Sequence, residues 1–345
     1  MKFNTYLEKF LKDFEPVFSA TMTSWAENSS KKAPTLSPVL KEFIKQNKGG
    51  KRIRPALVKL GYELAGGDKN DKNILHPAIA FEVFQTAILT HDDIIDKSTL
   101  RRGKKSIHEA LGGNHYGVSQ AISLGDLGFF YSMQILAESD FPDVDKNKAL
   151  GYFTKIIQET LLGEMLDVQI PTQKIVAIED TITIASLKTA SYSITGPLTL
   201  GSILGGGAQT NNIRDIKMFG DNLGIAYQLL DDLQGIYSDE KITGKSSMSD
   251  MKEGKRTILY IYAYAHASES DRKIITKLYG NNKLQAKDAE LIRKIFKNSG
   301  AHEFTINEIE KYTKRSQEFI TSLTNKKELH DLLNNMTTYL LKREH

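Results

Sequence analysis

The placement of proline is the feature of this sequence that most restricts its fold. All eight prolines lie within residues 1–197, and residues 198–345 contain none. Proline removes a helical hydrogen-bond donor and clashes with the preceding turn, so it collects at helix starts and in loops. Between the prolines, apolar residues recur at spacings of three and four, as at Ile79, Val83 and Ala87. Sustained alternation with a period of two is hard to find, so the sequence predicts an all-α protein.

The breaks between the expected helices are short and polar. They fall at residues 27–37, 66–73, 112–113, 140–145, 205–207, 240–249 and 280–282. None is long or biased enough for an interdomain linker, and no internal repeat shows. We therefore expect a single domain over residues 1–345, with a motif-bearing core at about 43–260 and a more charged helical layer at about 270–345.

Composition excludes several classes of protein. The 46 Lys+Arg and 42 Asp+Glu residues, with 40% hydrophobic residues, are typical of a globular chain. The absence of cysteine excludes disulfide frameworks, cysteine-based zinc sites and thiol catalysis. Charges interrupt the first nine residues too early for a secretory signal, and no run reaches the ~18 apolar residues of a membrane span. We expect a cytoplasmic protein without a membrane anchor.

The first acidic motif is HDDIID at residues 91–96, after the mostly apolar residues 81–89. Asp92 and Asp96 are four positions apart, about 40° round a helix and ~6 Å along it, so both carboxylates project from one face. Such a pair suits Mg²⁺ shared with substrate phosphates. Carboxylates at a helix C-terminus also need a compensating cation, because the helix dipole disfavours them there. A solvated acidic helix end is the alternative interpretation, and His91 is expected to be a structural neighbour rather than a base.

The second acidic motif is QLLDDLQG at residues 228–235, and it again ends an apolar helical run. Two aspartate pairs in similar contexts, separated by some 140 residues, are hard to explain as two surface accidents. They indicate two carboxylate walls that face each other across a cleft, with a small cluster of metal ions between them.

Basic residues accompany both acidic motifs. They are Lys51 and Arg54 in GGKRIRP (residues 49–55), Arg101 and Arg102 in RRGKK (residues 101–105), and Lys188, Lys245 and Lys255. We expect polyanions bound between these cations and the aspartates, rather than direct salt bridges, because arginine suits bidentate contact with phosphate. Nucleic acid is a poor candidate, since the acidic motifs would repel its backbone and a net charge of +4 is small.

Other catalytic motifs fail on spacing. Residues 243–246 look like the end of a phosphate-binding P-loop, but Asp239 stands where its first glycine is required. Residues 205–207 cannot supply GxGxxG, Gly112 replaces the second histidine of HExxH, and no GxSxG elbow occurs. Dinucleotide and nucleophilic chemistries therefore have no support.

The motifs together resemble those of the trans-isoprenyl diphosphate synthase (polyprenyl synthetase) family, over roughly residues 43–260. GGKRIRP, HDDIID followed by RRG, a lone Lys188-Thr189, and QLLDDLQG followed by TGK occur in the family's order and spacing. The resemblance, which is to geranylgeranyl and farnesyl diphosphate synthases in particular, implies a helical bundle around a deep central cavity and a homodimer. The reaction it implies is the head-to-tail condensation of an allylic diphosphate with isopentenyl diphosphate, which releases pyrophosphate.

The resemblance also implies a role for each motif residue. Asp92 and Asp96 would ligate two Mg²⁺ ions and Asp231 a third, with Asp93 and Asp232 in the outer shell. The allylic diphosphate would be held by Arg101, Lys188, Lys245 and Lys255, and isopentenyl diphosphate by Lys51, Arg54, Gln85 and Arg102. Thr189 and Gln228 would stabilise the developing carbocation. Helix geometry independently allows Gln85, which lies two turns before Asp92 on nearly the same face.

The same resemblance predicts the length of the product. In this family the growing chain runs beside the first aspartate helix, so the side chains upstream of Asp92 form a floor. Ala87 and Ile88 provide no aromatic plug there, and Phe84 lies about a turn deeper. We expect a product of about twenty carbons or somewhat more, unless Phe84 only packs in the core.

The sequence departs from the family pattern in the second motif. Gly235 replaces the third aspartate of DDxxD, and Asp239 could assist through a water molecule. This opens a rival assignment, because the segment nearly matches the second metal motif of class I terpene cyclases. Cyclases take one diphosphate and would not need the basic set at Lys51, Arg54 and Arg102. A non-catalytic partner subunit of a heteromeric synthase is a further alternative, but such subunits typically lose aspartates that this chain retains. Residues 340–343 either close over bound diphosphate or form a solvated tail.

Overall fold

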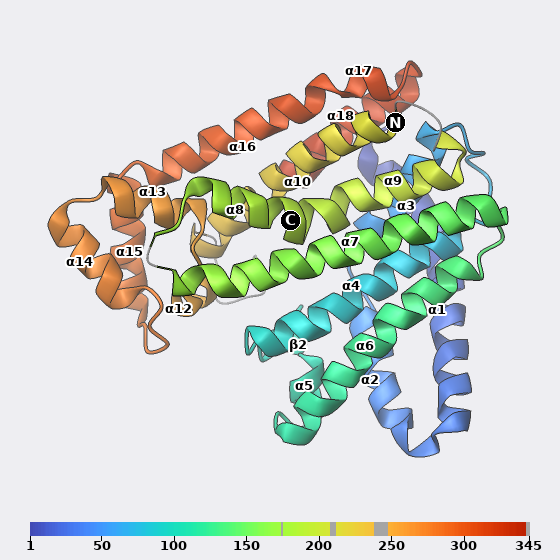
Figure 1. Cartoon of the computed structure of the whole chain (residues 1–345), viewed down its shortest axis with the longest axis horizontal. Coiled ribbons are helices and arrows are strands. Elements are labelled where there is room, and N and C mark those ends of the chain that lie inside the picture. Colours follow the sequence, from blue (N-terminus) through green and yellow to red (C-terminus); the bar gives the residue numbers. More distant parts are fainter. Residues whose placement is uncertain (174, 208–211, 238–247, 343–345) are drawn as a thin grey trace. The chain divides into compact units, whose positions relative to one another are not determined.

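The computed structural model describes residues 1–173, 175–207, 212–237 and 248–342 (Figure 1). The described residues are almost entirely helical. The exception is a hairpin in which β1 (Leu100–Arg101) pairs antiparallel with β2 (Lys104–Lys105), with Leu100 opposite Lys105. The expectation of an all-α fold is confirmed. No helix among these residues combines the length and apolar character needed to cross a membrane.

The chain forms two compact units that interleave along the sequence. Unit 1 comprises Met1–Thr154, Pro197–Ile213 and Lys326–Leu332, and unit 2 comprises Lys155–Gly196, Arg214–Asn325 and Leu333–His345. The first acidic motif lies in unit 1 and the second in unit 2. The single domain expected over residues 1–345 stays a prediction.

The helices of unit 1 follow the proline pattern closely. They are α1 (Phe3–Lys32), the 3₁₀ turn η1 (Pro34–Leu36), α2 (Ser37–Asn47), α3 (Ile53–Leu64), α4 (Leu75–Ile95), α5 (Ile107–Ala110), α6 (His115–Ala137), the first part of α7 (Asp143–Gln169) and α9 (Gly196–Leu204). Pro38, Pro55, Pro77 and Pro197 all stand within the first three residues of a helix. Pro16 is an exception, because it lies inside α1. Its exposed position and the buried stack of Phe10, Phe14 and Phe18 on the same helix offset the lost hydrogen bond.

Helix α4 is the centre of unit 1 and packs against α3 and α6. Its residues are buried nearly all round, and they include Phe81, Phe84 and Ala87. Glycines on α6 permit the close approach. A Cβ at Gly125 would overlap the ring of His91, and one at Gly128 would lie 2.7 Å from Phe43 and 2.9 Å from Ala87. The contact between α4 and α6 therefore fixes the helix that ends in the first acidic motif.

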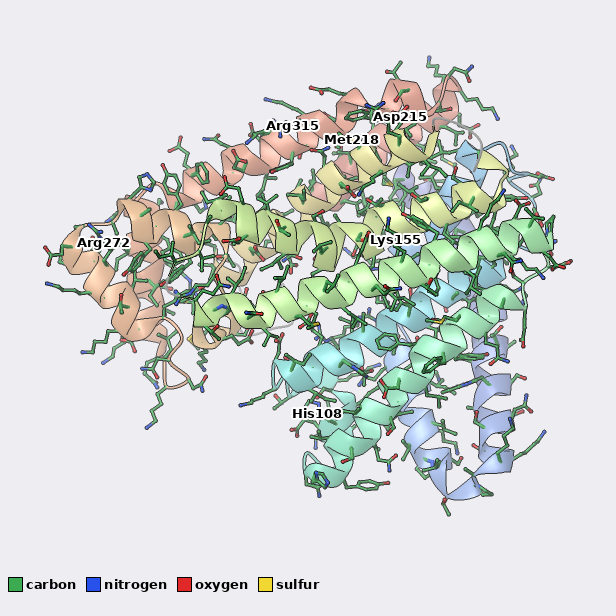
Figure 2. All side chains as sticks on the ribbon, in the orientation of Figure 1. His108, Lys155, Asp215, Met218, Arg272 and Arg315 are labelled. Carbon is green, nitrogen blue, oxygen red and sulfur yellow. The ribbon has the colours of Figure 1, made fainter. Side chains whose placement is uncertain are left out.

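Unit 2 contains the second set of helices. They are the end of α7, the 3₁₀ turn η2 (Ile170–Thr172), α8 (Ile178–Ile184), the π-helix η3 (Ala185–Thr195), α10 (Asn212–Tyr237) from Arg214 onward, α12 (Ser249–Glu253), α13 (Ile258–His266), α14 (Glu269–Leu278), α15 (Ala286–Asn298), α16 (Ala301–Glu318), α17 (Ile320–Leu323) and α18 (Lys327–Lys342) from Leu333 onward, its first residues being in unit 1. Charged side chains such as Arg272 of α14 and Arg315 of α16 extend from the outer faces of these helices into solvent (Figure 2).

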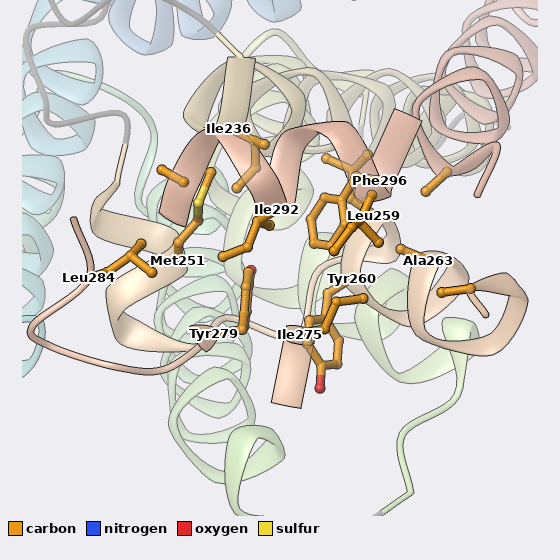
Figure 3. Packing of buried hydrophobic residues seen from close by; sticks show 14 residues of the cluster. Ile236, Met251, Leu259, Tyr260, Ala263, Ile275, Tyr279, Leu284, Ile292 and Phe296 are labelled. Atoms are coloured by element: carbon orange, nitrogen blue, oxygen red, sulfur yellow. The ribbon is translucent and has the colours of Figure 1, made fainter. Parts of the chain in front are cut away.

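One apolar cluster of unit 2 joins the second acidic helix to the helices after residue 270. Ile236 of α10, Met251 of α12 and Leu259 of α13 pack with Ile292 and Phe296 of α15 (Figure 3). The helical layer expected at about 270–345 therefore shares a hydrophobic core with the end of α10.

Candidate active site

The first acidic motif occupies the last turn of α4, where Asp96 is the C-cap residue. Asp93 is buried and Asp92 is half-buried. The β1–β2 hairpin returns Arg101 to this helix end. The Nε of Arg101 donates to Oδ1 of Asp93 at 2.8 Å, and its Nη2 donates to Oδ2 of Asp92 at 2.7 Å and to Oδ1 of Asp93 at 2.5 Å. Burial alone would lower the pKa of Arg101, but the two carboxylates raise it above its ordinary value.

This geometry corrects one expectation. Direct salt bridges between the flanking cations and the aspartates were not expected, yet Arg101 forms them with Asp92 and Asp93. The physical reason is the one that also favours a metal ion here: carboxylates at a helix C-terminus oppose the dipole and need nearby positive charge. The guanidinium supplies that charge from within the chain.

Arginine side chains gather beside this motif in unit 1. Arg102 has a left-handed backbone (φ 53°), and its Nη1 donates to the carbonyl oxygen of Gly49 at 3.3 Å. A Cβ at Gly50 would lie 3.0 Å from the same Nη1, so this position favours glycine. Burial lowers the pKa of Arg102; Glu82 opposes the shift, and the positive charges of Arg52, Arg54 and Arg101 add to it. Several positively charged guanidinium groups thus repel one another, and a bound anion would reduce this repulsion.

A pocket connects these groups. It is lined by Gln46, Thr86, Leu89, Thr90, Asp93, Arg101, Arg102 and Ile107. Lys51 is exposed in the loop before α3, Arg54 is half-buried in the first turn of α3, and Gln85 is half-buried on α4. The predicted isopentenyl diphosphate residues therefore all lie in the same unit as the first acidic motif.

Arg52 has a different role from its neighbours in KRIR. Its side chain is buried, with Nη1 donating to Oε1 of Glu82 at 2.5 Å and Nε donating to Oε1 of Glu15 at 2.8 Å. Its guanidinium carbon also stands 4.5 Å from the centre of the Phe18 ring. The left-handed backbone of Arg52 (φ 50°) precedes α3. This network ties the loop with Lys51 to α1 and α4, and no local pattern indicates it, because the basic residues of the motif look alike in the sequence.

In unit 2, the predicted Lys188 and Thr189 lie on the π-helix η3. The Nζ of Lys188 lies 2.7 Å from Oε2 of Glu164 and 2.7 Å from Oδ2 of Asp167, both on α7. A Cβ at Gly163 would overlap the backbone of Lys188, so α7 approaches this turn closely. Lys188 therefore sits between two carboxylates of α7, which belong to neither acidic motif. Long π-helical stretches are rare and concentrate at functional sites.

A chain of hydrogen bonds links η3 to the second acidic motif. Thr189 donates to Oε1 of Gln228 at 2.5 Å, and Nε2 of Gln228 donates to Oδ1 of Asp232 at 2.7 Å. Burial and the nearby Asp250 carboxylate raise the pKa of Asp232 to about 8. Asp231, the predicted ligand, is exposed at the surface of α10. The structure thus joins Thr189, Gln228 and Asp232.

Asp250 is a residue that sequence reasoning missed. Its Oδ2 lies where a Cβ at Gly235 would stand, so the glycine that breaks the DDxxD pattern makes room for a carboxylate from α12. The Nζ of Lys255 lies 3.6 Å from Oδ1 of Asp250 and 3.2 Å from Oε2 of Glu253, again as direct ion pairs that were not expected. Gly235 itself is the sequence signal, because the missing third carboxylate of the DDxxD motif indicates that a carboxylate from another segment could lie there.

Of the remaining predicted residues, three are described by the structure and three are not. Phe84, Ala87 and Ile88 are buried in unit 1, and the Phe84 ring centre lies 5.8 Å from that of Phe129 and 5.6 Å from that of Phe153. Lys245, Asp239 and residue 343 lie outside the described residues. That the two acidic motifs face each other stays a prediction.

Comparisons with known proteins agree with this fold. The structure superimposes on geranylgeranyl pyrophosphate synthase from Corynebacterium glutamicum, solved with isoprenyl diphosphate and magnesium, with a TM-score of 0.87, 27% identity, and coverage of 97% of this chain and 99% of that one. The fold is thus that of the helical prenyl synthases. The chain also matches the polyprenyl synthetase family model over residues 37–297, and it belongs to that family.

Among curated relatives, the chain is 31% identical over 287 residues to geranylgeranyl diphosphate synthase of Sulfolobus acidocaldarius, covering 81% of this chain and 83% of the relative. It is 29% identical over 303 residues to geranylfarnesyl diphosphate synthase of Aeropyrum pernix, covering 86% of this chain and 91% of the relative. The predicted family resemblance is confirmed.

The buried network around Arg52 leads to a prediction about stability. Replacing Arg52 with Met leaves the Glu82 carboxylate buried without its counter-charge, and we expect a loss of about 3 kcal/mol in the free energy of unfolding. The matched control is Lys72→Met, which removes an exposed partner 3.5 Å from Asp13 and should cost less than about 0.5 kcal/mol. Urea unfolding measures both variants. Equal losses would contradict the role assigned to Arg52.

Proposed function

We propose that this protein condenses an allylic diphosphate with isopentenyl diphosphate head to tail and releases pyrophosphate. Family membership supports the reaction class. The observation that carries the proposal is in unit 1, where the Asp92–Asp93–Arg101 group adjoins Arg102, which bonds to the loop before α3. That loop holds Lys51, and Arg54 follows in the first turn of α3. The carboxylates would hold the metal ions that bind one diphosphate. The separate group of basic side chains would bind a second diphosphate. A terpene cyclase takes a single diphosphate and would have no use for the second group.

The donor atoms fit magnesium. Mg²⁺ prefers carboxylate oxygens and commonly takes one or two of them together with water and substrate phosphates. Asp92, Asp96 and Asp231 offer such oxygens from half-buried or exposed positions. No three histidine or carboxylate side chains converge as a metal site among the residues that the structure describes. We propose that Asp92 and Asp96 hold two ions and Asp231 a third. When bound, Mg²⁺ supplies positive charge that stabilises the departing pyrophosphate.

The side chains of the chain itself perform the other steps. Arg101, Lys188 and Lys255 add positive charge at the leaving group. They would exchange their present carboxylate partners for phosphate oxygens. The Oε1 dipole of Gln228, oriented by the Thr189 hydroxyl and by Asp232, stabilises the allylic carbocation. Lys51, Arg54, Gln85 and Arg102 hold isopentenyl diphosphate so that its double bond attacks that cation. The released pyrophosphate accepts the final proton.

We further propose a product of about twenty carbons or somewhat more. Ala87 and Ile88 are not aromatic themselves, and Phe84, about one turn earlier on α4, packs with Phe129 and Phe153. The named products of the two curated relatives agree with this range.

A homodimer is proposed from the outer face of α6. Tyr116, Ile122, Leu127 and Phe130 are exposed along this helix, and Phe130 is 71% exposed. An apolar face of this kind on a single helix calls for a partner surface, and a second copy of the same helix provides one.

The reaction is tested with purified protein, Mg²⁺, an allylic primer and labelled isopentenyl diphosphate. We expect chain-extended alcohols after phosphatase treatment, and none in excess chelator. Asp92→Asn and Asp231→Asn should each lower kcat/KM at least about 100-fold, because each removes a metal ligand at the leaving group. The control Asp13→Asn, a surface carboxylate of unit 1, should be as active as the wild type. A cyclic hydrocarbon formed without isopentenyl diphosphate would refute the proposal. So would activity that requires a second, different chain.

The product length is tested at Ala87. The substitution Ala87→Phe adds an aromatic ring to the α4 face, at a position that packs closely against Gly128 of α6, and we expect a product shorter by at least one isoprene unit. Phe84→Ala removes the deeper ring and should lengthen the product. Chromatography of the dephosphorylated alcohols measures both, and thermal unfolding shows whether the larger side chain at position 87 is tolerated. An unchanged product from a folded Ala87→Phe protein would exclude this wall as the determinant of length.

The dimer is tested by light scattering. Phe130→Asp places a charge in the proposed interface and should convert the dimer to a monomer. Leu291→Asp on α15, where the native leucine is 39% exposed, is the matched control and should remain dimeric. A wild-type monomer would end this proposal.

A further inference from the structure

The helices after residue 270 hold the second acidic motif and Lys255 in place. We propose that Tyr279 and Arg293, on the α14–α15 layer (residues 269–298), are positioning residues for the allylic diphosphate site. Neither touches the substrate in this proposal, because both act through backbone atoms of the elements that bear the binding groups. The inference rests on the proposed function for the identity of the ligand, but its geometry lies entirely in unit 2.

The first connection is made at the end of α10. The Nε of Arg293 donates to the carbonyl oxygen of Ile236 at 2.6 Å, and the hydroxyl of Tyr237 donates to the carbonyl oxygen of Arg293 at 3.3 Å. Carbonyl groups near a helix C-terminus carry the negative end of the helix dipole, so a guanidinium beside the Ile236 carbonyl is favourable. The donor of the first bond is on α15, and the donor of the second bond is on α10. They fix the end of the helix that carries Asp231 and Asp232.

The second connection is made at the turn before Lys255. The hydroxyl of Tyr279 donates to the carbonyl oxygen of Lys255 at 2.8 Å, and the N–H of Gly280 donates to the carbonyl oxygen of Met251 at 2.7 Å. Gly254 and Gly280 both have left-handed backbones (φ 72° and 81°), and a Cβ at Gly254 would lie 3.1 Å from the Cα of Gly280. The two turns are therefore in direct contact. Burial raises the pKa of Tyr279 well above its ordinary value, so its hydroxyl remains a donor.

Apolar packing makes the two connections parts of one structure. Tyr279, Ile292 and Phe296 of the layer lie in the same buried cluster as Ile236 and Met251, two of the residues whose carbonyls receive these bonds (Figure 3). A shift of the layer would move the end of α10 and the Lys255 turn together. Because misplacement by about 1 Å is enough to weaken a preorganised site, the layer has a direct route to substrate affinity.

The test uses two substitutions. Arg293→Met removes the guanidinium, and with it both the Nε donor to Ile236 and the ion pair of Nη1 with Glu290, whereas Tyr279→Phe removes one hydroxyl. The matched controls are Arg272→Met, an exposed arginine of the same layer (Figure 2), and Tyr262→Phe, whose ring stacks on His266 and Phe304 and whose hydroxyl forms no hydrogen bond with the described residues. Steady-state kinetics gives the KM of each substrate. Calorimetry with inorganic pyrophosphate and Mg²⁺ gives an affinity that does not depend on turnover.

Each of the two variants, Arg293→Met and Tyr279→Phe, should raise the KM for the allylic diphosphate and weaken pyrophosphate binding about five- to tenfold, because each loses the hydrogen bond that fixes a carbonyl of the site-bearing element. The KM for isopentenyl diphosphate should change less than about twofold, since its residues lie in unit 1. Both controls should match the wild type. Unchanged pyrophosphate affinity in variants with lowered thermal stability would show a merely structural layer and overturn the inference, as would equal changes in both KM values. If the wild type and both controls make no prenyl product, the proposed function fails instead, and the pyrophosphate measurement still tests the positioning role.

Discussion

Carboxylates near helix ends require positive charge close by, and basic side chains supply that charge in each unit. Asp92 and Asp93 end α4, where the helix dipole opposes their charge, and Arg101 returns from a hairpin to neutralise them. Lys188 lies between Glu164 and Asp167 in the same way, and Lys255 between Asp250 and Glu253. Positive charge is thus kept next to negative charge throughout the candidate site. In the proposed reaction, Asp92 and Asp96 would hold metal ions, and Arg101 would then be available to phosphate oxygens.

This exchange explains how a site can be stable and also bind polyanions. A permanent cluster of unmatched arginines would repel itself, and burial already lowers the pKa of Arg102 beside its neighbours. Glu82 moderates that repulsion by pairing with Arg52. One arginine of GGKRIRP is therefore used for folding, while Lys51 and Arg54 stay at more accessible positions.

The sequence predicts the fold class and the helix ends well, because proline chemistry and apolar spacing act locally. The position of Asp96 at the end of α4 follows from such local rules. The role of Arg52 could not be predicted, since its partners Glu15 and Glu82 come from distant helices. The same holds for Asp250, which fills the space left by Gly235 only once α12 has packed against α10. The π-helix at Lys188 also has no local signal; it is stabilised by side-chain bonds to other helices, such as that of Ser191 to Glu159.

The helical layer after residue 270 shows most clearly where sequence patterns lose information. Its charged, proline-free segments indicate only amphipathic helices. Arg293 and Tyr279 each bond to a backbone carbonyl of another element. The pair that the sequence does offer, Glu290 with Arg293, lies within α15 and says nothing of the contact with α10. Positioning through a backbone carbonyl thus gives no residue-type signal on the side of the acceptor. It is effective nonetheless, since a carbonyl moves with its whole helix or turn, and the side chains of Asp231 and Lys255 move with it.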